Sequence, residues 1–232
     1  MLWKSDHDAR MSHVPGCGTI VDELHTFCSQ CWKGIEFMGP GGCERCGLPL
    51  EATDLDMCAA CLARPPRLHR IRSAVSYDNV TRGVVIRLKF GRKVALAKTM
   101  ARYMAPLAGA LPEDSLLVPV PLHRNRLWQR GFNQSAIIAA ELSKRLGVPS
   151  RPRALLRVKS TPPLKGLSRL QRRKTVAGAF RVSGAANLRG RTVVLVDRLR
   201  GAAKVASGHR GGAAHHVVAR PAHAVLALDP AG

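Results

Sequence analysis

The sequence predicts an α/β protein in two unequal parts, a cysteine-rich module followed by a basic domain with a doubly wound parallel sheet. All seven cysteines precede residue 62, and from residue 65 onward strand-length apolar runs alternate with helical patterns. A chain of 232 residues with 46% apolar content supplies one ordinary core and a small appended module. We therefore expect parts at residues 1–64, 65–197 and 198–232, the last being an aberrant basic tail rich in Ala, Gly and His.

The cysteines of the first part indicate a zinc-ribbon-like module. Three Cys-x-x-Cys pairs follow one another, and two such pairs complete a tetrahedral sulfur site that suits structural zinc. The second and third pairs form one complete site, whereas the first pair has a single upstream partner because Val14 stands where a cysteine would complete it. His13 or His25 is the alternative fourth ligand there. The candidate ligands are Cys17, Cys28, Cys31, Cys43, Cys46, Cys58 and Cys61.

The second part begins after Pro65 and Pro66, which form a linker because proline disfavours regular structure. Apolar periodicity predicts its elements, with Asn133 as a helix cap. The expected strands are residues 72–77, 116–122, 154–158 and 192–197; the expected helices begin at residue 81 and span 94–111 and 133–146; a basic loop spans 123–130, and a loop with a basic helix spans 159–178. Ligands of such sheets bind at the carboxyl ends of the strands.

Charge divides the chain in the same way. The formal net charge is +22, yet residues 1–61 hold 4 basic and 9 acidic residues, which leaves 33 and 6 for residues 62–232. Such an excess favours a polyanionic partner, with a solvated basic surface as the alternative. The charged N-terminus and the lack of an apolar run of about 20 residues predict no membrane insertion. We expect a cytoplasmic protein, where reduced thiols bind metal rather than form disulfides.

Three motifs follow one another in the second part: Val118-Pro-Val-Pro-Leu-His-Arg124 running to residues 130–134, residues 161–169 running to 172–173 and 178–180, and Val193-Val-Leu-Val-Asp197. In this order they resemble the ComF competence protein family, whose members join a double zinc ribbon to a type I phosphoribosyltransferase domain. The resemblance covers residues 13–197. It implies a phosphoribosyltransferase-like sheet and a link to DNA uptake in natural transformation.

The resemblance also implies phosphate-binding positions. The turn from Pro119 to Arg124 matches the loop that meets pyrophosphate, and a later segment matches the flexible loop and helix that close over the diphosphate. Cations at these places can stabilise the charge of a leaving pyrophosphate, although each arginine alone is also compatible with a solvated side chain. The implied phosphate and diphosphate ligands are His123, Arg124, Arg130, Lys165, Arg169, Arg172 and Arg173.

The chain departs from the family pattern after Asp197, its surviving site acid. The pattern implies a second acid and a threonine-rich loop that cradles a 5′-phosphate, but Arg198 follows and no threonine occurs after Thr192. Residues 198–232 contain ten Ala, four of the nine His and one acid, as out-of-frame translation of a GC-rich gene would give. A frameshift and true divergence are both open explanations. Either predicts a vestigial Asp197, no catalysis and an uncovered side of the sheet.

Two functions follow. The first is a phosphoribosyltransferase-fold protein that binds phosphoribosyl diphosphate or another phosphorylated ligand and needs Mg²⁺ only if it is catalytically active. The second is a non-enzymatic zinc-ribbon protein that binds single-stranded DNA or a DNA-uptake partner through the basic domain. An aromatic content of 4% predicts that DNA contacts would be mostly to phosphate rather than to stacked bases.

Overall fold

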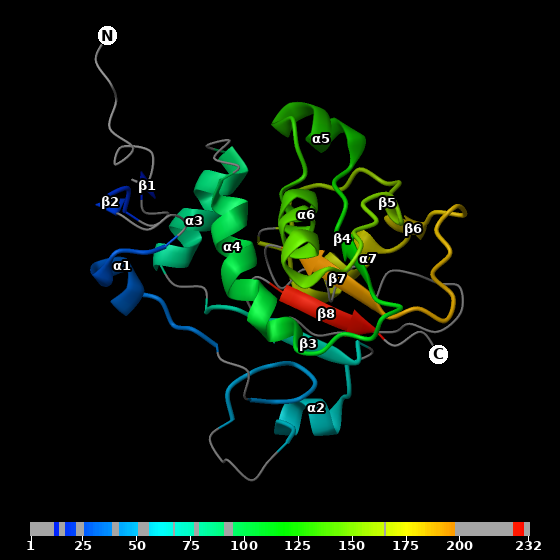
Figure 1. Ribbon diagram of the computed structural model, residues 1–232. Coiled ribbons are helices and arrows are strands. Elements are labelled where there is room, and N and C mark those ends of the chain that lie inside the picture. Colours follow the sequence, from blue (N-terminus) through cyan, green and yellow to red (C-terminus); the bar gives the residue numbers. More distant parts are fainter. Residues whose placement is uncertain are drawn as a thin grey trace.

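The computed structural model describes residues 12–13, 17–21, 26–38, 42–50, 56–66, 68–76, 79–90, 95–164, 166–197 and 225–229. Its centre is a four-stranded sheet in the order β3-β8-β7-β4, formed by Arg70–Ser73, Val225–Asp229, Val193–Asp197 and Leu116–Pro119. Helices lie in front of this sheet in Figure 1, and the cysteine-rich segments lie to its left and below it. The mixture of helices and strands confirms the α/β class.

The sheet is mixed rather than wholly parallel. β4 and β7 are parallel, with Leu117 opposite Val194, as expected for this class. β8 runs antiparallel to both β7 and β3, with Ala227 opposite Leu195 on one side and Ile71 on the other. Over the described residues the prediction of a parallel sheet therefore holds for the β4–β7 pair but is wrong for β8.

β8 also corrects the expectation that the tail leaves the sheet uncovered. Four apolar residues from Val225 to Leu228 form a strand within the predicted aberrant part, and this strand fills the position between β3 and β7. The backbone N–H and C=O groups on the side of β7 that faces away from β4 are thus paired with β8. In an edge strand such groups would stay unpaired. Composition alone concealed this segment, because a short apolar run is compatible with many structures.

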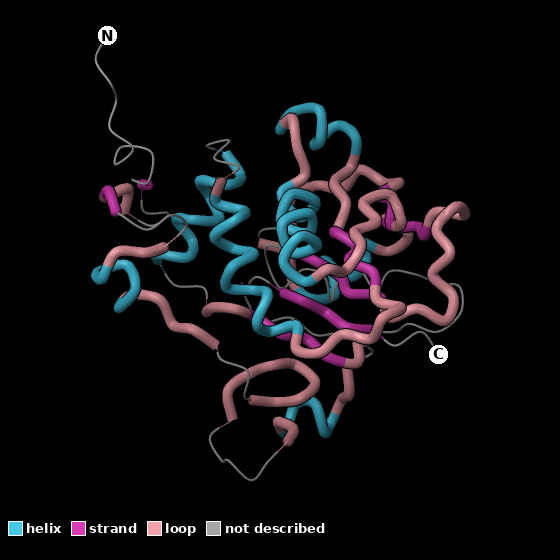
Figure 2. The backbone as a smooth tube through the Cα atoms, in the orientation of Figure 1, coloured by secondary structure: helices cyan, strands magenta, loops and turns pink. Residues whose placement is uncertain are grey.

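Two core clusters lie on opposite faces of the sheet because successive strand residues point to opposite sides. Leu117, Val194 and Val196 point toward one cluster, whereas Leu116 and Leu195 point toward the other. The first cluster is covered by α3 (Asn79–Phe90), α4 (Leu96–Met104) and α6 (Gln134–Leu146). The second is covered by α7 (Arg169–Val176) and by the antiparallel pair β5 (Leu155–Arg157) and β6 (Phe180–Val182). Figure 2 shows these helices and strands around the central strands.

Several predicted boundaries shift for local reasons. The helix expected over 94–111 ends at Met104 and continues as the 3₁₀ turn η1 (Ala105–Ala108), because Pro106 has no backbone N–H to donate to the carbonyl of Arg102. The loop expected over 123–130 is the helix α5 (Arg124–Arg130), which begins at the capping residue His123 and ends at Gly131 in the left-handed conformation. β6 was not predicted, and it pairs with β5 in a separate two-stranded sheet.

The cysteine-rich segments form short elements. These are β1 (Ser12–His13), β2 (Ile20–Val21), α1 (Ser29–Lys33) and α2 (Ala59–Ala63). Within the described part of the chain, no helix has the length and apolar character required to cross a bilayer.

Candidate functional site

The second and third Cys-x-x-Cys pairs meet in one cluster. The Sγ atoms of Cys43, Cys46, Cys58 and Cys61 all lie within 4.8 Å of one another. The Sγ atoms of Cys46 and Cys58 are 3.7 Å apart, close to the edge of about 3.8 Å that a zinc–sulfur distance of about 2.3 Å gives in a tetrahedron. This thiol set fits a structural zinc ion with no open coordination position, as the sequence predicted.

The backbone around Cys43 brings the first two thiols of this cluster together. The Gly47 N–H donates to the carbonyl of Cys43 over 2.7 Å, and the Cys43 N–H donates to Leu48 over 2.8 Å. Gly47 has a φ of 67°, and a Cβ there would lie 2.6 Å from the carbonyl oxygen of Ile71 in β3. Only glycine fits both this conformation and this approach to the sheet.

A buried arginine joins the four-thiol cluster to the sheet. Arg72, which is 7% exposed, donates from its guanidinium to the carbonyls of Cys43 (3.3 Å), Glu44 (3.0 Å) and Ile71 (3.1 Å). Burial lowers the pKa of Arg72, and the neighbouring charge of Arg70 lowers it further. The three carbonyls offset part of this desolvation cost, so the turn and β3 are held as one unit.

Cys17, Cys28 and Cys31 form the second cluster, with their Sγ atoms also within 4.8 Å of one another. The Sγ atoms of Cys17 and Cys28 are 3.6 Å apart. Cys28 caps α1 and accepts from the Cys31 N–H over 3.5 Å, much as Cys58 stands at the start of α2. Among the described residues no fourth ligand joins this group, and Val14 and His25 lie outside them. The cluster can hold zinc through three thiolates.

Proton affinities differ sharply within each cluster. The hydroxyl and backbone N–H of Thr19 lower the pKa of Cys17 to about 6, whereas burial and the nearby thiols raise the pKa of Cys31 to about 12. Burial opposes ionisation of Cys43, but backbone N–H groups, that of Cys46 foremost, outweigh it and lower its pKa to about 6. Each cluster thus holds one thiol that ionises readily, and a bound metal ion would displace the remaining protons.

A second candidate site lies at the carboxyl ends of β4 and β7. Asp197, the last residue of β7, accepts a hydrogen bond of 2.8 Å from the Ser135 hydroxyl at the start of α6. The Asn133 side chain caps α6 and also donates to the carbonyl of Val120 over 3.0 Å. The N-terminus of α6 and Asp197 therefore meet at the edge where ligands of parallel strands bind.

The predicted phosphate ligands lie on two elements. His123 caps α5, accepting from the Asn125 N–H over 3.4 Å, and this helix begins with Arg124 and ends with Arg130. Arg172 and Arg173 lie on α7, where the Nε of Arg172 is buried without a hydrogen-bond partner. The backbone of Arg169 begins α7, whereas its side chain and all of Lys165 lie outside the described residues.

Sequence reasoning missed two arginines that converge on Thr161. The Nη2 atom of Arg126 donates to the Thr161 carbonyl over 2.8 Å, and the Nη2 atom of Arg157 donates to the Thr161 hydroxyl. The Arg157 guanidinium lies 5.4 Å from the centre of the Phe180 ring, and its Nε is buried without a partner. Burial lowers the pKa of Arg157, and the charge of Arg126 lowers it further. A charged residue inside the apolar strand 154–158 was the available signal.

Comparison with known proteins identifies the first part of the chain. Residues 13–62 match the family described as Double zinc ribbon domain. A DNA utilization protein YhgH of Salmonella typhi is 32% identical over 176 residues, which is 73% of this chain and 76% of that protein. The YhgH protein of Escherichia coli (strain K12) is 31% identical over 161 residues, covering 67% and 70%. Competence protein F of Haemophilus influenzae is 30% identical over 187 residues, covering 78% and 80%.

No solved structure shows significant similarity to the chain. Its two thiol clusters and its mixed helices and strands define an α/β protein with a double zinc ribbon. Together with the relatives above, these features place it further: the chain belongs to the ComF family of competence proteins.

Proposed function

We propose that this ComF protein serves DNA uptake and that its basic domain binds a phosphorylated ligand of the phosphoribosyl diphosphate type without turning it over. The observation that carries the proposal is the convergence of Arg126 and Arg157 on Thr161. Among the described residues, Arg126 is the charged group that shifts the pKa of Arg157, and no acid offsets it there. A bound anion would relieve this repulsion and satisfy the buried Nε, because two guanidinium groups favour a multiply charged phosphate.

The arrangement of the strand ends supports a phosphoribosyltransferase-like domain. The parallel pair β4–β7 with α6 packed against it matches the geometry in which such folds bind ligands at the carboxyl edge. Asp197 supplies one acid at this edge, but Arg198 replaces the second acid implied by the family pattern. Without threonine hydroxyls after Thr192 the chain lacks the groups expected to grip a sugar phosphate, which favours binding without catalysis and leaves Mg²⁺ unnecessary.

The role in DNA uptake rests on the relatives and on charge. One relative is named Competence protein F and others are named DNA utilization proteins. The excess of 33 basic over 6 acidic residues in 62–232 suits a protein that works next to nucleic acid.

Calorimetry with phosphoribosyl diphosphate, with and without Mg²⁺, tests the proposal. We expect the full chain to bind this ligand without releasing pyrophosphate. The Arg157→Met variant should lose affinity about tenfold or more, because charge-assisted hydrogen bonds are removed. Arg181→Met is the matched control, since Arg181 is an exposed arginine on the partner strand β6. Equal affinities of the two variants would show that the arginine pair does not bind the ligand. Steady release of pyrophosphate would refute the proposed loss of catalysis.

A second candidate function is binding of single-stranded DNA by a non-enzymatic zinc-ribbon protein. The observation that favours it is on α5, where an almost wholly exposed tryptophan stands among arginines. Both functions are compatible within one protein, because Arg126 donates to the Thr161 carbonyl whereas the tryptophan side chain is exposed to solvent.

A further inference from the structure

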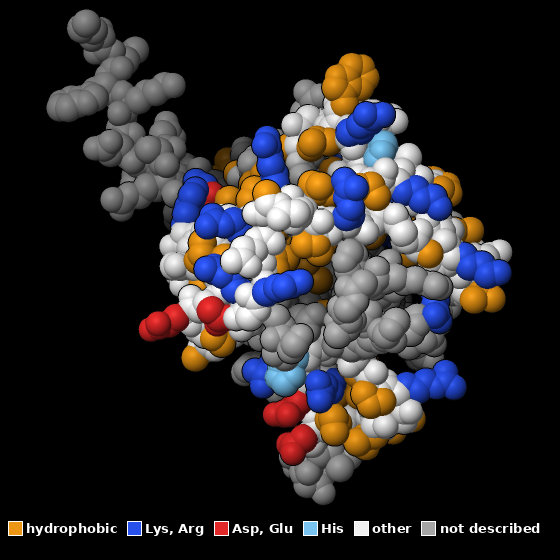
Figure 3. All heavy atoms as spheres, turned by 90° about the vertical axis from the view of Figure 1, so that its right-hand side faces the viewer, with side chains coloured by type: hydrophobic (Ala, Val, Ile, Leu, Met, Phe, Trp, Pro, Cys, Tyr) orange, Lys and Arg blue, Asp and Glu red, His pale blue; other side chains and the backbone are white. Residues whose placement is uncertain are grey.

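Trp128 is the most anomalous side chain on the described surface. It is 88% exposed in the middle of α5, and its neighbour Leu127 is 42% exposed. A tryptophan normally buries most of its ring, since its large apolar surface is costly in water. Figure 3 shows a hydrophobic side chain standing clear of the surface at the top of the molecule, where α5 lies in Figure 1. No contact among the described residues accounts for the exposed position of the indole.

The side chains of α5 point in two directions. Arg126 turns inward to the Thr161 carbonyl, while Leu127 and Trp128 are exposed. Arg124 is also exposed and lies one helical turn before Trp128, so the two share a face. A shallow depression of about 770 Å³ accompanies this face, lined by Arg124, Asn125, Leu127, Trp128, Gln129 and Gly131.

The charge around this face has one sign. No acidic residue occurs between Asp114 and Glu141, whereas α5 and its cap contribute three arginines and His123. In Figure 3 most of the visible acidic side chains lie in the lower part of the view, whereas Lys and Arg side chains also occur in its upper part. The surface therefore combines a free aromatic face with a local excess of guanidinium groups, a composition that suits a polyanion carrying aromatic rings.

We infer that α5 is a contact for single-stranded nucleic acid, in which the Trp128 indole stacks on an unpaired base and Arg124 binds a neighbouring phosphate. Single strands fit better than a duplex because only unpaired bases present their faces to an indole. A protein partner fits less well, since the apolar area offered is small and the charged residues of α5 are all basic. The inference rests on the second candidate function above and names the surface that performs it.

Binding of a labelled oligothymidine to the full chain tests the inference by fluorescence anisotropy. We expect Trp128→Ala to weaken binding about 5- to 100-fold, as removal of a stacking side chain does, and Trp128→Phe to restore most of it. Arg124→Gln should weaken binding mildly and lower the slope of log affinity against log salt by about 1, because one phosphate contact is lost. The matched control is Leu170→Ala, which removes a 61% exposed apolar side chain on α7.

An abasic oligonucleotide of the same length separates stacking from charge. The wild-type protein should prefer the thymidine strand, and Trp128→Ala should abolish this preference while leaving affinity for phosphoribosyl diphosphate unchanged. Wild-type binding without any effect of Trp128→Ala would overturn the inference but leave DNA binding by the domain intact. Absence of oligonucleotide binding by the wild type would refute the second candidate function itself. A preserved melting temperature in the variants, expected for so exposed a position, shows that folding is not the cause.

Discussion

The two cysteine clusters differ both in their ligands and in how they are attached to the α/β domain. The four-thiol cluster is attached by hydrogen bonds to β3: Arg72 holds two carbonyls of its turn, and the Ile71 N–H donates to Arg45 over 2.8 Å. The three-thiol cluster is attached largely by rings. Tyr103 of α4 lies 5.6 Å from Phe27, 6.0 Å from Trp32 and 5.4 Å from Phe37 between ring centres.

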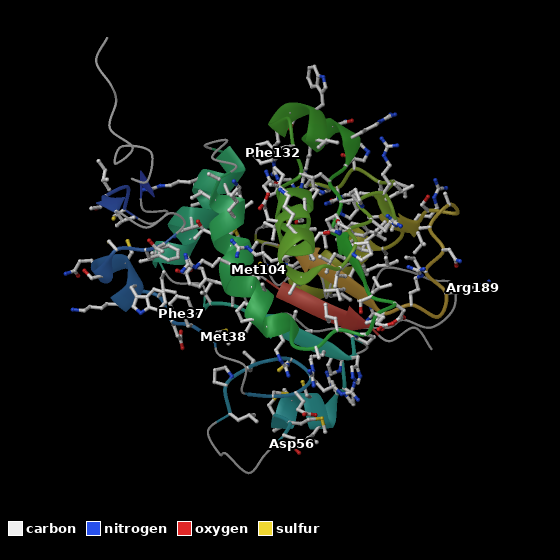
Figure 4. The ribbon with its side chains drawn as sticks, in the orientation of Figure 1. Phe37, Met38, Asp56, Met104, Phe132 and Arg189 are labelled. Carbon is white, nitrogen blue, oxygen red and sulfur yellow. The ribbon has the colours of Figure 1, made fainter. Side chains whose placement is uncertain are left out.

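The residues that follow α1 also contact the residues that directly follow β3. Phe37 forms an isolated antiparallel bridge with Val75, and the Met38 N–H donates to Ala74 over 3.1 Å. Figure 4 labels Phe37 and Met38 on this stretch and Asp56 near α2 at the bottom of the view. Both halves of the zinc ribbon therefore dock on one continuous segment, residues 70–76.

The two modes of attachment indicate which half of the zinc ribbon depends on its metal. Hydrogen bonds to Cys43 and Glu44 require the turn to keep one geometry, and four thiolates around an ion fix that geometry. Ring packing is less directional, and it involves residues beside the cysteines rather than the turn itself. We therefore expect the four-thiol half to lose its attachment when its metal is lost, and the three-thiol half to keep much of its own.

The largest effect is expected from Cys46→Ser, which removes one ligand of the complete cluster. Structural zinc contributes an apparent binding free energy of about 10–16 kcal/mol to small zinc domains, so this variant should lose that ion and the folded turn with it. Zinc content by mass spectrometry and thermal melting measure the outcome. Cys17→Ser is the comparison variant and should cost far less, because its cluster is already incomplete and Cys17 is exposed. Equal losses in the two variants would show that the clusters are energetically equivalent.

Much of this contrast is predictable from the amino-acid sequence alone. Cys-x-x-Cys spacing indicated which thiols meet, and Val14 marked the incomplete half, because ligand geometry is local in sequence. Helices at Asn79–Phe90 and Gln134–Leu146 followed from apolar spacing in the same way. Local patterns of this kind survive folding because the core only reinforces them.

Features that depend on distant partners were not predictable in this way. β8 forms because β3 and β7 leave a position between them, and Arg72 is buried because a turn 28 residues earlier offers its carbonyls. Arg126 and Arg157 meet only through Thr161. The predicted ligands on α7 stay a prediction, as does the role of Asp197.

A matched pair of glycines provides a smaller effect. Gly47→Ala and Gly18→Ala both place an alanine at positive φ, 67° and 88°, but only the Cβ at Gly47 would meet backbone, the Ile71 carbonyl at 2.6 Å. We expect Gly18→Ala to cost about 1 kcal/mol and Gly47→Ala about 2–3 kcal/mol, equivalent to roughly 2–4 °C and 5–10 °C in Tm. Differential scanning calorimetry of the zinc-loaded chain measures both. A larger loss at Gly18 would mean that close docking on β3 does not stabilise the four-thiol half.

The Val14→Cys variant is expected to have the smallest effect on stability. Its effect on zinc ligation should be the most direct of all the variants. A fourth thiolate would complete the three-thiol cluster, so zinc there should resist a chelator at least about tenfold better, equivalent to about 1.4 kcal/mol. Competition with a chromogenic chelator measures this, and Val14→Ser controls for loss of the valine side chain. His13→Ala separates the two explanations for the wild type: if His13 already serves as the fourth ligand, its removal lowers zinc affinity and Val14→Cys adds nothing. A gain in Val14→Cys with no loss in either His13→Ala or His25→Ala would establish that the wild-type cluster binds through three thiolates. Ring packing rather than the metal would then hold this half of the ribbon in place.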